Sequence, residues 1–371
     1  MKWLFINTVP GQCSIHEKGL EIYSVLRKFG EPTYRATEAE LKFDEGRVKF
    51  IPRDGLNDPG KARDLVARGG YEFVVVNYHH TVNHFGRSFE DLPAAFGVPV
   101  YAMVTEVMMV APYACKLHGE WTKVFLLDPT LDGSHAMEQR NVMLRHSASR
   151  TSSSSRHTPG HFQWPGPLQH RELVAMPRPI VDWPKRRMEL NFSVPHKPNI
   201  GFHGFATMGK SLLPMFEQAI FEFKSFNLNI RLPSFSFGSG TEGDKKAVLL
   251  REVGEIRCKA QMIGGIDINV EESYVYRERL LEWCADQDLL CYHHEREMPG
   301  LASTIDDAVT VGTPVSVSNS STFRHVHQYQ DPYPKLKLRD AMVSDAVYRM
   351  WDDWQEEKFR ERFASHVLAD G

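Results

Sequence analysis

The sequence has few cysteines and no long apolar run. Its five cysteines, among 371 residues, are scattered and form no C-x-x-C pair. This argues against a disulfide framework and a cysteine zinc site, and it indicates a reducing, cytoplasmic location. No stretch approaches the roughly 18 apolar residues of a membrane-spanning helix. The N-terminal run MKWLFINTVPG lacks a small-residue cleavage site, so we interpret it as a first strand.

A basic excess is also missing. The formal net charge is -3 at pH 7, so a nucleic-acid partner is not indicated. Hydrophobic residues make up 42% of the chain and charged residues 25%, the balance of a soluble globular protein. A chain of this length exceeds one ordinary core, which predicts two domains.

Strand-like apolar runs alternate with helical patterns along the chain. The first half contains KWLFINTV, RVKFIPR, YEFVVVNYHH, VPVYAMVTEV and TKVFLLDP, and the pattern restarts at NIGFHG. Such alternation predicts an α/β fold with two Rossmann-like domains that face a cleft. The expected divisions are an N-terminal domain at 1–175 with a Ser-, Pro- and Gly-rich surface loop at 147–170, a linker at 176–197, a C-terminal domain at 198–345 and a final amphipathic helix at 346–371.

Residues 204–211 read GFATMGKS, the G-x-x-x-x-G-K-S spacing of a phosphate-binding P-loop. A strand pattern precedes this segment and a helical pattern follows it. Two interior positions, Phe205 and Met208, are bulky, whereas a loop that wraps around phosphate favours small residues. Asp267, the nearest candidate for a magnesium-binding acid, does not close an apolar strand. The residues alone leave open a P-loop, a chance match, and a helix N-terminus that binds another phosphate together with Lys210.

A second motif lies further along the chain. Residues 295–317 read EREMPGLASTIDDAVTVGTPVSV, in which Glu297 precedes a G-L pair and Asp307 precedes GTPV. This pattern resembles the donor-binding domain of glycosyltransferases of the GT-B fold, where two acids flank a G-L segment before G-x-P-V. Here the two acids are two residues further apart, and the second is Asp307 in place of glutamate, with Asp306 as the alternative.

The resemblance implies how a donor would be held. Lys210 would meet the donor diphosphate, and its loop contains no arginine to match the family's companion residue. Helix N-termini at Ser211 and near Ser303 would add backbone donors. Glu297 would accept hydrogen bonds from the sugar, and Asp307 from the ribose. Further donor contacts are expected at Gly204, Gly300, Leu301 and Ala302.

The resemblance also implies separate roles for the two domains. The N-terminal domain would bind the acceptor, and the helix at 346–371 would cross back onto that domain. The donor would be a nucleoside-diphosphate sugar, with no cofactor and no catalytic metal. The acceptor, a glycan, lipid, small molecule or macromolecule, stays open.

Three residues near predicted strand ends of the first domain are candidate catalytic bases: His16, His79 and Glu106. A strand end at a cleft is where an acid–base group would sit. His79 and His80 point to opposite sides of a strand, so no metal site is predicted there. Retaining and inverting chemistry both stay open.

These patterns predict a glycosyltransferase of the hexosyltransferase kind. Three alternatives accompany it. The first is a P-loop NTPase that uses GFATMGKS. The others are a sugar-nucleotide epimerase and a binding protein of the same fold without transfer activity.

Overall fold

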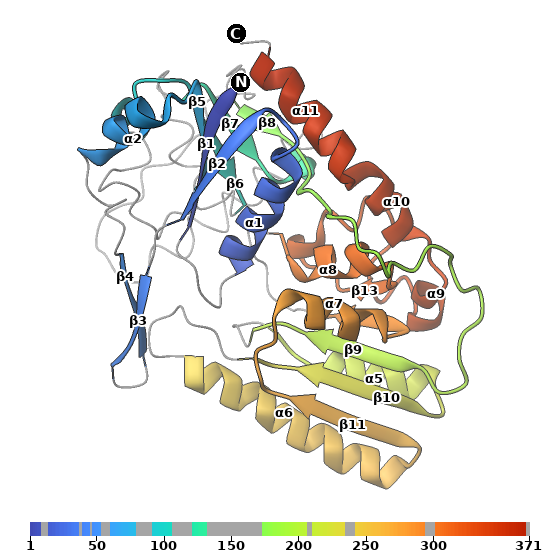
Figure 1. The fold of residues 1–371 in the computed structure, drawn as a ribbon. Helices are drawn as coiled ribbons and strands as arrows, with labels where there is room; N and C mark the ends of the chain where they lie inside the picture. Colours follow the sequence, from blue (N-terminus) through green and yellow to red (C-terminus); the bar gives the residue numbers. More distant parts are fainter. Residues whose placement is uncertain are drawn as a thin grey trace, which may run out of the picture. The chain divides into compact units, whose positions relative to one another are not determined.

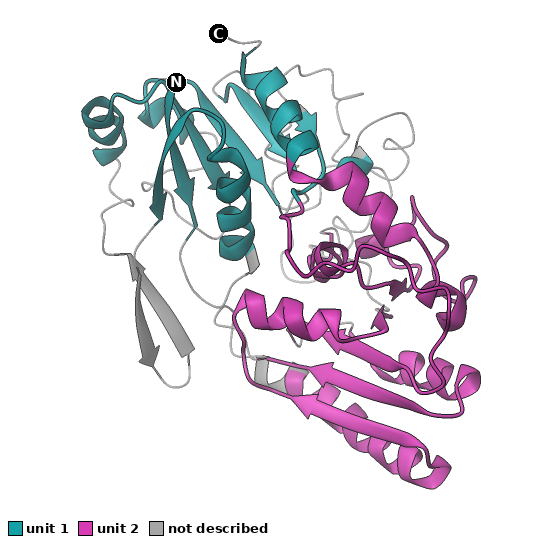
Figure 2. Cartoon of the chain, turned by 45° about the vertical axis from the view of Figure 1, so that its right-hand side comes forward, with its two compact units in different colours: residues 1–179, 357–371 teal, residues 180–356 magenta. Residues whose placement is uncertain are grey.

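The computed structural model describes residues 1–8, 14–36, 39–44, 47–52, 60–78, 91–105, 121–131, 173–205, 210–233, 242–293 and 301–368. The chain divides into two compact units, one formed by Met1–Pro179 with Glu357–Gly371 and the other by Ile180–Glu356 (Figure 2). Each unit contains a parallel β-sheet with helices (Figure 1), which confirms the predicted α/β fold with two Rossmann-like domains.

The sheet of unit 1 has the strand order β2-β1-β5-β6-β7-β8, and its strands are parallel. Strand β5 reads FVVVNY and is buried along its whole length, as expected of a parallel strand whose two faces are both covered. The strands are β1 (Lys2–Asn7), β2 (Glu31–Ala36), β5 (Phe73–Tyr78), β6 (Val100–Val104), β7 (Lys123–Leu126) and β8 (Leu173–Ala175).

Two features of unit 1 differ from the sequence-based expectation. The RVKFIPR run forms β4 (Arg47–Pro52), which pairs antiparallel with β3 (Ala39–Asp44) outside the parallel sheet. The edge of the sheet is instead β2, whose EPTYRA sequence is only partly buried and contains a proline. Proline is tolerated on an edge strand because one side of such a strand has no ladder to donate to. The α-helices of unit 1 among its described residues are α1 (Ser14–Leu26), α2 (Lys61–Gly69) and α11 (Glu356–Leu368), whose first residue belongs to unit 2.

Helix α11 packs its apolar stripe against unit 1. Phe359, Phe363 and Val367 are buried at a spacing of four residues, which places them on one helix face. The Phe363 ring lies 5.3 Å from Phe125 and 5.6 Å from Phe29, measured between ring centroids. The C-terminal end of the chain therefore completes the core formed by its beginning.

The sheet of unit 2 has the strand order β11-β10-β9-β12-β13 and is parallel throughout. The strands are β9 (Asn199–His203), β10 (Phe226–Arg231), β11 (Ile266–Glu271), β12 (Leu289–Tyr292) and β13 (Val315–Val317). The helices are α5 (Leu213–Glu222), α6 (Glu242–Ile263), α7 (Arg277–Ala285), α8 (Thr304–Val311), α9 (Leu338–Met342) and α10 (Ala346–Trp354). None of the described helices is both long and apolar enough to cross a membrane.

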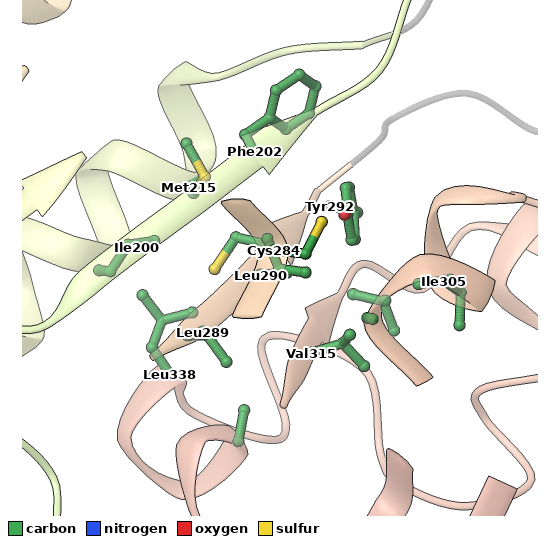
Figure 3. Packing of buried hydrophobic residues seen from close by; sticks show 14 of the residues in the cluster. Ile200, Phe202, Met215, Cys284, Leu289, Leu290, Tyr292, Ile305, Val315 and Leu338 are labelled. Atoms are coloured by element: carbon green, nitrogen blue, oxygen red, sulfur yellow. The ribbon is translucent and has the colours of Figure 1, made fainter. Parts of the chain in front are cut away.

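The core of unit 2 is one apolar cluster that joins strands and helices. Ile200 and Phe202 of β9 and Leu290 of β12 meet Met215 of α5 and Ile305 of α8 in this cluster (Figure 3). Helix α8 ends at Gly312, whose φ of 77° is left-handed. A Cβ at Gly312 would lie 2.5 Å from the carbonyl oxygen of Arg187, so glycine allows α8 to end against this segment.

The segment 346–371, expected to pack back on the N-terminal domain, forms two helices, α10 and α11, that belong to different units. Helix α10 belongs to unit 2, where Val347, Met350 and Trp354 enter the core, and only the residues from Glu357 onward belong to unit 1. Residues 180–197, expected as a linker, also belong to unit 2. The side chain of Arg186 donates to the carbonyl oxygens of Val309 and Thr310 near the end of α8, which attaches this segment to the domain.

Candidate functional site

The carboxyl ends of parallel strands lie at one edge of a sheet, and three polar side chains mark that edge in unit 2. Strand β9 ends at His203 and β10 at Arg231, and these two residues are register partners on adjacent strands. His293 directly follows β12. Ligands of open α/β sheets bind beyond this edge, so the described residues at and after these strand ends, with the groups they contact, form the candidate site.

Gly204, directly after β9, allows two elements to meet. Its φ of 130° is a conformation that residues with a side chain rarely adopt. A Cβ at this position would lie 2.7 Å from Nζ of Lys210 and 3.3 Å from Cγ2 of Thr304. The Lys210 ammonium and the first turn of α8 therefore both lie against the Gly204 backbone, although Lys210 and Thr304 are far apart in the sequence.

Lys210 supplies a positive charge at this point. Its side chain is partly buried, and its Nζ lies 5.8 Å from the centre of the Phe202 ring. Burial lowers the pKa of Lys210 to about 8, because a desolvated ammonium is less stable than a solvated one. In the described part of the chain, no carboxylate forms an ion pair with this ammonium. The group is therefore a cation near neutral pH that can accept an anionic partner.

The N-terminus of α8 adds backbone donors beside Lys210. Ser303 occupies the N-cap position without a side-chain cap. No acceptor within the described ranges takes the backbone N–H groups of Ser303 and Thr304, whereas the N–H of Ala302 donates to the carbonyl of Thr322. The first N–H groups of a helix carry a partial positive charge and bind anions. Lys210 and this helix end together form a site suited to an anion.

A buried carboxylate lies one turn further along α8. Asp307 is 6% exposed, and its Oδ1 accepts a short hydrogen bond from Nη1 of Arg277, the first residue of α7. The other oxygen, Oδ2, lies 3.8 Å from Nε2 of His203. The rings of Trp283 and Tyr292 pack edge-on against the His203 ring, with centroids at 5.9 and 5.5 Å. Asp307, predicted to meet a ribose, thus has a cationic partner within the protein.

His203 itself is neutral at physiological pH. Burial lowers its pKa to about 4, Asp307 opposes that shift, and the three cations Lys210, Arg277 and Arg231 add to it. The contact between His203 and Asp307 is therefore not an ion pair at neutral pH, in spite of its distance. The positive charge of the cluster comes from the lysine and the arginines.

The residues just before α5 contact a carboxylate of the protein. The Leu212 N–H and the Ser211 hydroxyl both donate to Oε2 of Glu252 on α6, at 2.7 and 3.2 Å. Ser211, expected to contact the donor at a helix N-terminus, thus has a carboxylate of the protein as the partner of its hydroxyl. Glu252 lies 40 residues further along the chain, and its sequence context gives no sign of this contact.

Polar groups also gather at the strand ends of unit 1. Asn7, the last residue of β1, and Asn77 of β5 donate to the carbonyls of His16 and Ile15 at 3.0 and 3.1 Å, which holds the first turn of α1. Nδ1 of His16 lies 2.8 Å from the carbonyl oxygen of Thr8. A carbonyl can only accept, so Nδ1 carries the proton and Nε2 keeps its lone pair. Burial lowers the pKa of His16, which favours this neutral form.

Several predicted site residues lie outside the described residues: His79, Glu106, Glu297 and Gly300. Leu301 and Ala302 lie in the segment leading into α8 and are partly buried, which places them beside the open helix end. Asp306, the alternative second acid, is fully buried. Within the described ranges, no group of three or more His, Cys, Asp or Glu side chains is arranged to hold a metal ion.

Comparison with known proteins identifies the fold. No model of a known protein family matches the chain, and no curated protein does. Solved structures match it over its whole length. Anabaena HepE in complex with UDP has a TM-score of 0.58 at 9% identity and covers 100% of both chains. A UDP-forming trehalose-phosphate synthase from Burkholderia xenovorans has a TM-score of 0.57 at 11% identity and covers 99% of each chain.

The whole chain has the GT-B fold. The lipopolysaccharide outer core galactosyltransferase WaaB gives a further match, with a TM-score of 0.52 at 9% identity and 100% of both chains covered. Identities this low establish the fold alone, so the activity has to be argued from the residues. In the GT-B fold, unit 2 is the second domain, where the sequence resemblance places the donor, and the Lys210–α8 cluster lies in this unit.

Proposed function

We propose that this protein is a glycosyltransferase that takes a sugar from a nucleoside-diphosphate sugar. One observation carries the proposal: the Lys210 ammonium lies against Gly204 beside the open N-terminus of α8, at the carboxyl edge of the unit 2 sheet. A cation next to free backbone donors suits a diphosphate. Structures of this fold include complexes with UDP and UDP-glucose, so uridine nucleotides are the first donors to test.

Transfer would use the charge of this site. When the bond between the sugar carbon and the phosphate oxygen breaks, negative charge grows on the departing diphosphate. Lys210 and the N–H groups of Ser303 and Thr304 would stabilise that charge in the transition state. Glu297, Gly300, Leu301 and Ala302 remain proposed donor contacts on sequence grounds.

We propose that these protein groups suffice without a catalytic metal. Transfer activity should then persist in the presence of excess EDTA, measured as release of nucleoside diphosphate. Loss of activity on chelation, with recovery on adding Mg²⁺ or Mn²⁺, would contradict this part of the proposal.

For an inverting reaction, the acceptor hydroxyl needs a base, and we propose His16. Its neutral ring has Nδ1–H donated to the Thr8 carbonyl, which leaves the Nε2 lone pair to take a proton. His79 and Glu106 remain alternative bases predicted from the sequence. A cytoplasmic location remains part of the proposal, supported by the free thiols of Cys258, Cys284 and Cys291.

The P-loop NTPase alternative is disfavoured by Glu252. In a P-loop, the first N–H groups of the helix and the hydroxyl after the lysine face phosphate and magnesium. Here the Leu212 N–H and the Ser211 hydroxyl face a carboxylate instead. A triphosphate bound there would have to displace that carboxylate or be repelled by it.

Calorimetric titration with UDP, GDP, ADP and their sugars tests the proposal. We expect at least one nucleoside diphosphate to bind and Lys210→Ala to weaken that binding. If none binds to protein that circular dichroism shows to be folded, the proposal is wrong. Product analysis then distinguishes a glycosyltransferase from the two alternatives of the same fold. An epimerase would change the sugar while it is still attached to the nucleotide. A binding protein without transfer activity would release no nucleoside diphosphate with any acceptor.

A further inference from the structure

The loop after β9 carries a single cation in GFATMGKS, yet a diphosphate bears more than one negative charge. A second cation beside Lys210 would balance this charge. Two arginines, like Lys210, lie near enough to His203 to act on its ring: Arg231 at the end of β10 and Arg277 at the start of α7. Both belong to unit 2.

Of these two arginines, Arg277 is the more accessible. The Arg231 side chain is 11% exposed, pairs with Glu271, and lies 5.6 Å from the centre of the Trp283 ring. The Arg277 side chain is 22% exposed and is attached to Asp307. A guanidinium has five N–H donors in a planar fork, so contacts within the protein are compatible with an anionic partner as well.

The attachment of Arg277 places it at the site. Asp307 stands three residues after Thr304 on α8, and residues at that spacing are neighbours on one helix face. Thr304 in turn adjoins Gly204 and, through it, the Lys210 ammonium. The partner of Arg277 and the neighbour of Lys210 therefore belong to the same turn of one helix.

The charges of the cluster also favour this arrangement. The described charged groups that act on His203 are Lys210, Arg231, Arg277 and Asp307, and Arg231 pairs with Glu271. The imidazole itself is neutral, and so is Tyr292, whose ring packs against it. Left alone, the Asp307 carboxylate would repel a diphosphate. Paired with Arg277, it adds no net negative charge and fixes where the guanidinium lies.

We infer that Arg277 is the second cation that binds the diphosphate of the donor, and that Asp307 is a positioning residue that holds Arg277 in place. This inference rests on the proposed function. It assigns the second cation to a helix outside the β9–α5 loop. It also replaces the direct ribose contact that the sequence predicted for Asp307.

The test compares nucleoside diphosphate with nucleoside monophosphate, because only the former carries the second phosphate. Calorimetry or competition titration gives Kd for UDP and UMP, or for the diphosphate and monophosphate of whichever base binds. We expect Arg277→Ala to weaken diphosphate binding about 10- to 100-fold and monophosphate binding much less. The Kd of Arg277→Lys for nucleoside diphosphate should lie between those of the wild type and Arg277→Ala, since lysine keeps the charge and loses the planar fork of donors.

Arg279→Ala is the matched control. Arg279 lies two residues further on the same helix, is 79% exposed and pairs with Glu282, so its removal changes the net charge equally without touching the cluster. Both Kd values should stay at the wild-type level. An equal loss in Arg279→Ala would show that only the overall charge matters, and would overturn the inference.

Asp307→Asn separates positioning from ribose contact. A positioning role predicts a selective loss of diphosphate binding, and no further loss when Arg277→Ala is combined with it. A ribose contact predicts equal loss for diphosphate and monophosphate, which would overturn the role given to Asp307. Thermal melts check that each variant is folded. If Asp307→Asn does not fold, diphosphate and monophosphate binding are compared in Arg277→Lys instead.

The outcomes also separate this inference from the proposed function. If the wild-type protein binds no nucleoside diphosphate, the proposed function fails and the inference fails with it. If the wild-type protein binds one and Arg277→Ala binds it equally well, the proposed function stands and the inference alone is wrong.

Discussion

Gly204 shows how a single residue decides the chemistry of the site. Its spacing to Lys210 was visible in the sequence, and in the structure Nζ of Lys210 lies against the Gly204 backbone. Arg277 and Glu252 were not predictable. They reach their partners Asp307 and Ser211 across 30 and 41 residues, from helices α7 and α6. Local spacing predicts loop residues, whereas partners from other elements require the fold.

Replacing Gly204 with alanine should disrupt the site. The new Cβ would lie 2.7 Å from Nζ of Lys210, and a φ of 130° is strained for alanine. We expect a destabilisation of about 1–3 kcal/mol and at least tenfold weaker binding of nucleoside diphosphate, corresponding to one charge-assisted contact. Thermal melts and calorimetry measure the two effects. Gly254→Ala is the control: nothing lies within 4 Å of its Cβ, and in a helix it should stabilise by about 0.5–1 kcal/mol.

Lys210 should make nucleotide binding depend on pH. Its pKa is lowered from 10.5 to about 8 by burial, so the ammonium is charged at neutral pH and loses its proton as the pH rises through 8. Affinity for nucleoside diphosphate should therefore fall from about pH 7 to about pH 9, with proton uptake on binding in the upper part of that range. In Lys210→Arg the guanidinium stays charged, so this fall should disappear. An identical pH profile in both proteins would assign the dependence to another group.

The C-terminal helices show what periodicity reveals about an element and what it leaves out. Spacing predicted that Val347, Met350, Trp351 and Trp354 share one face and that Phe359 and Phe363 share another. Trp351 is partly buried, and the other five are buried. Periodicity does not say against which core a face packs. The break between α10 and α11 sends the first set into unit 2 and the second into unit 1.

Phe363 should carry much of the contribution of α11 to the stability of unit 1. It is fully buried between the rings of Phe29, Tyr101 and Phe125. Truncation to alanine should destabilise by about 3–5 kcal/mol through lost burial and a cavity. Glu361→Ala on the exposed side of the same helix should change stability by less than about 0.5 kcal/mol. Urea denaturation followed by tryptophan fluorescence compares them, and equal midpoints would mean that α11 does not hold unit 1 together.

At the scale of the whole molecule, the alternation of strands and helices was sufficient to predict two parallel-sheet units, because each buried strand pattern is strong and local. The boundaries between the units were harder to predict from the sequence. Residues 180–197 look like a linker from their prolines, yet Arg186 and neighbouring residues attach them to unit 2. Composition describes a segment's own flexibility and cannot show the partners that hold it.

Substitutions in the two units should affect different steps, namely activation of the acceptor and binding of the donor. His16 lies in unit 1, and Lys210 lies in unit 2. If His16 is the base, His16→Ala should lower the rate of transfer about 10²- to 10⁴-fold, while the Kd for nucleoside diphosphate stays unchanged. Lys210→Ala, in contrast, should raise the Kd for nucleoside diphosphate. His196→Ala, at an exposed position, controls for the loss of a histidine. Because Nδ1 of His16 is bonded to Thr8, a thermal melt must show that the variant is folded. A folded His16→Ala protein that transfers sugar at the wild-type rate would exclude His16 as the base and direct the search to His79 and Glu106.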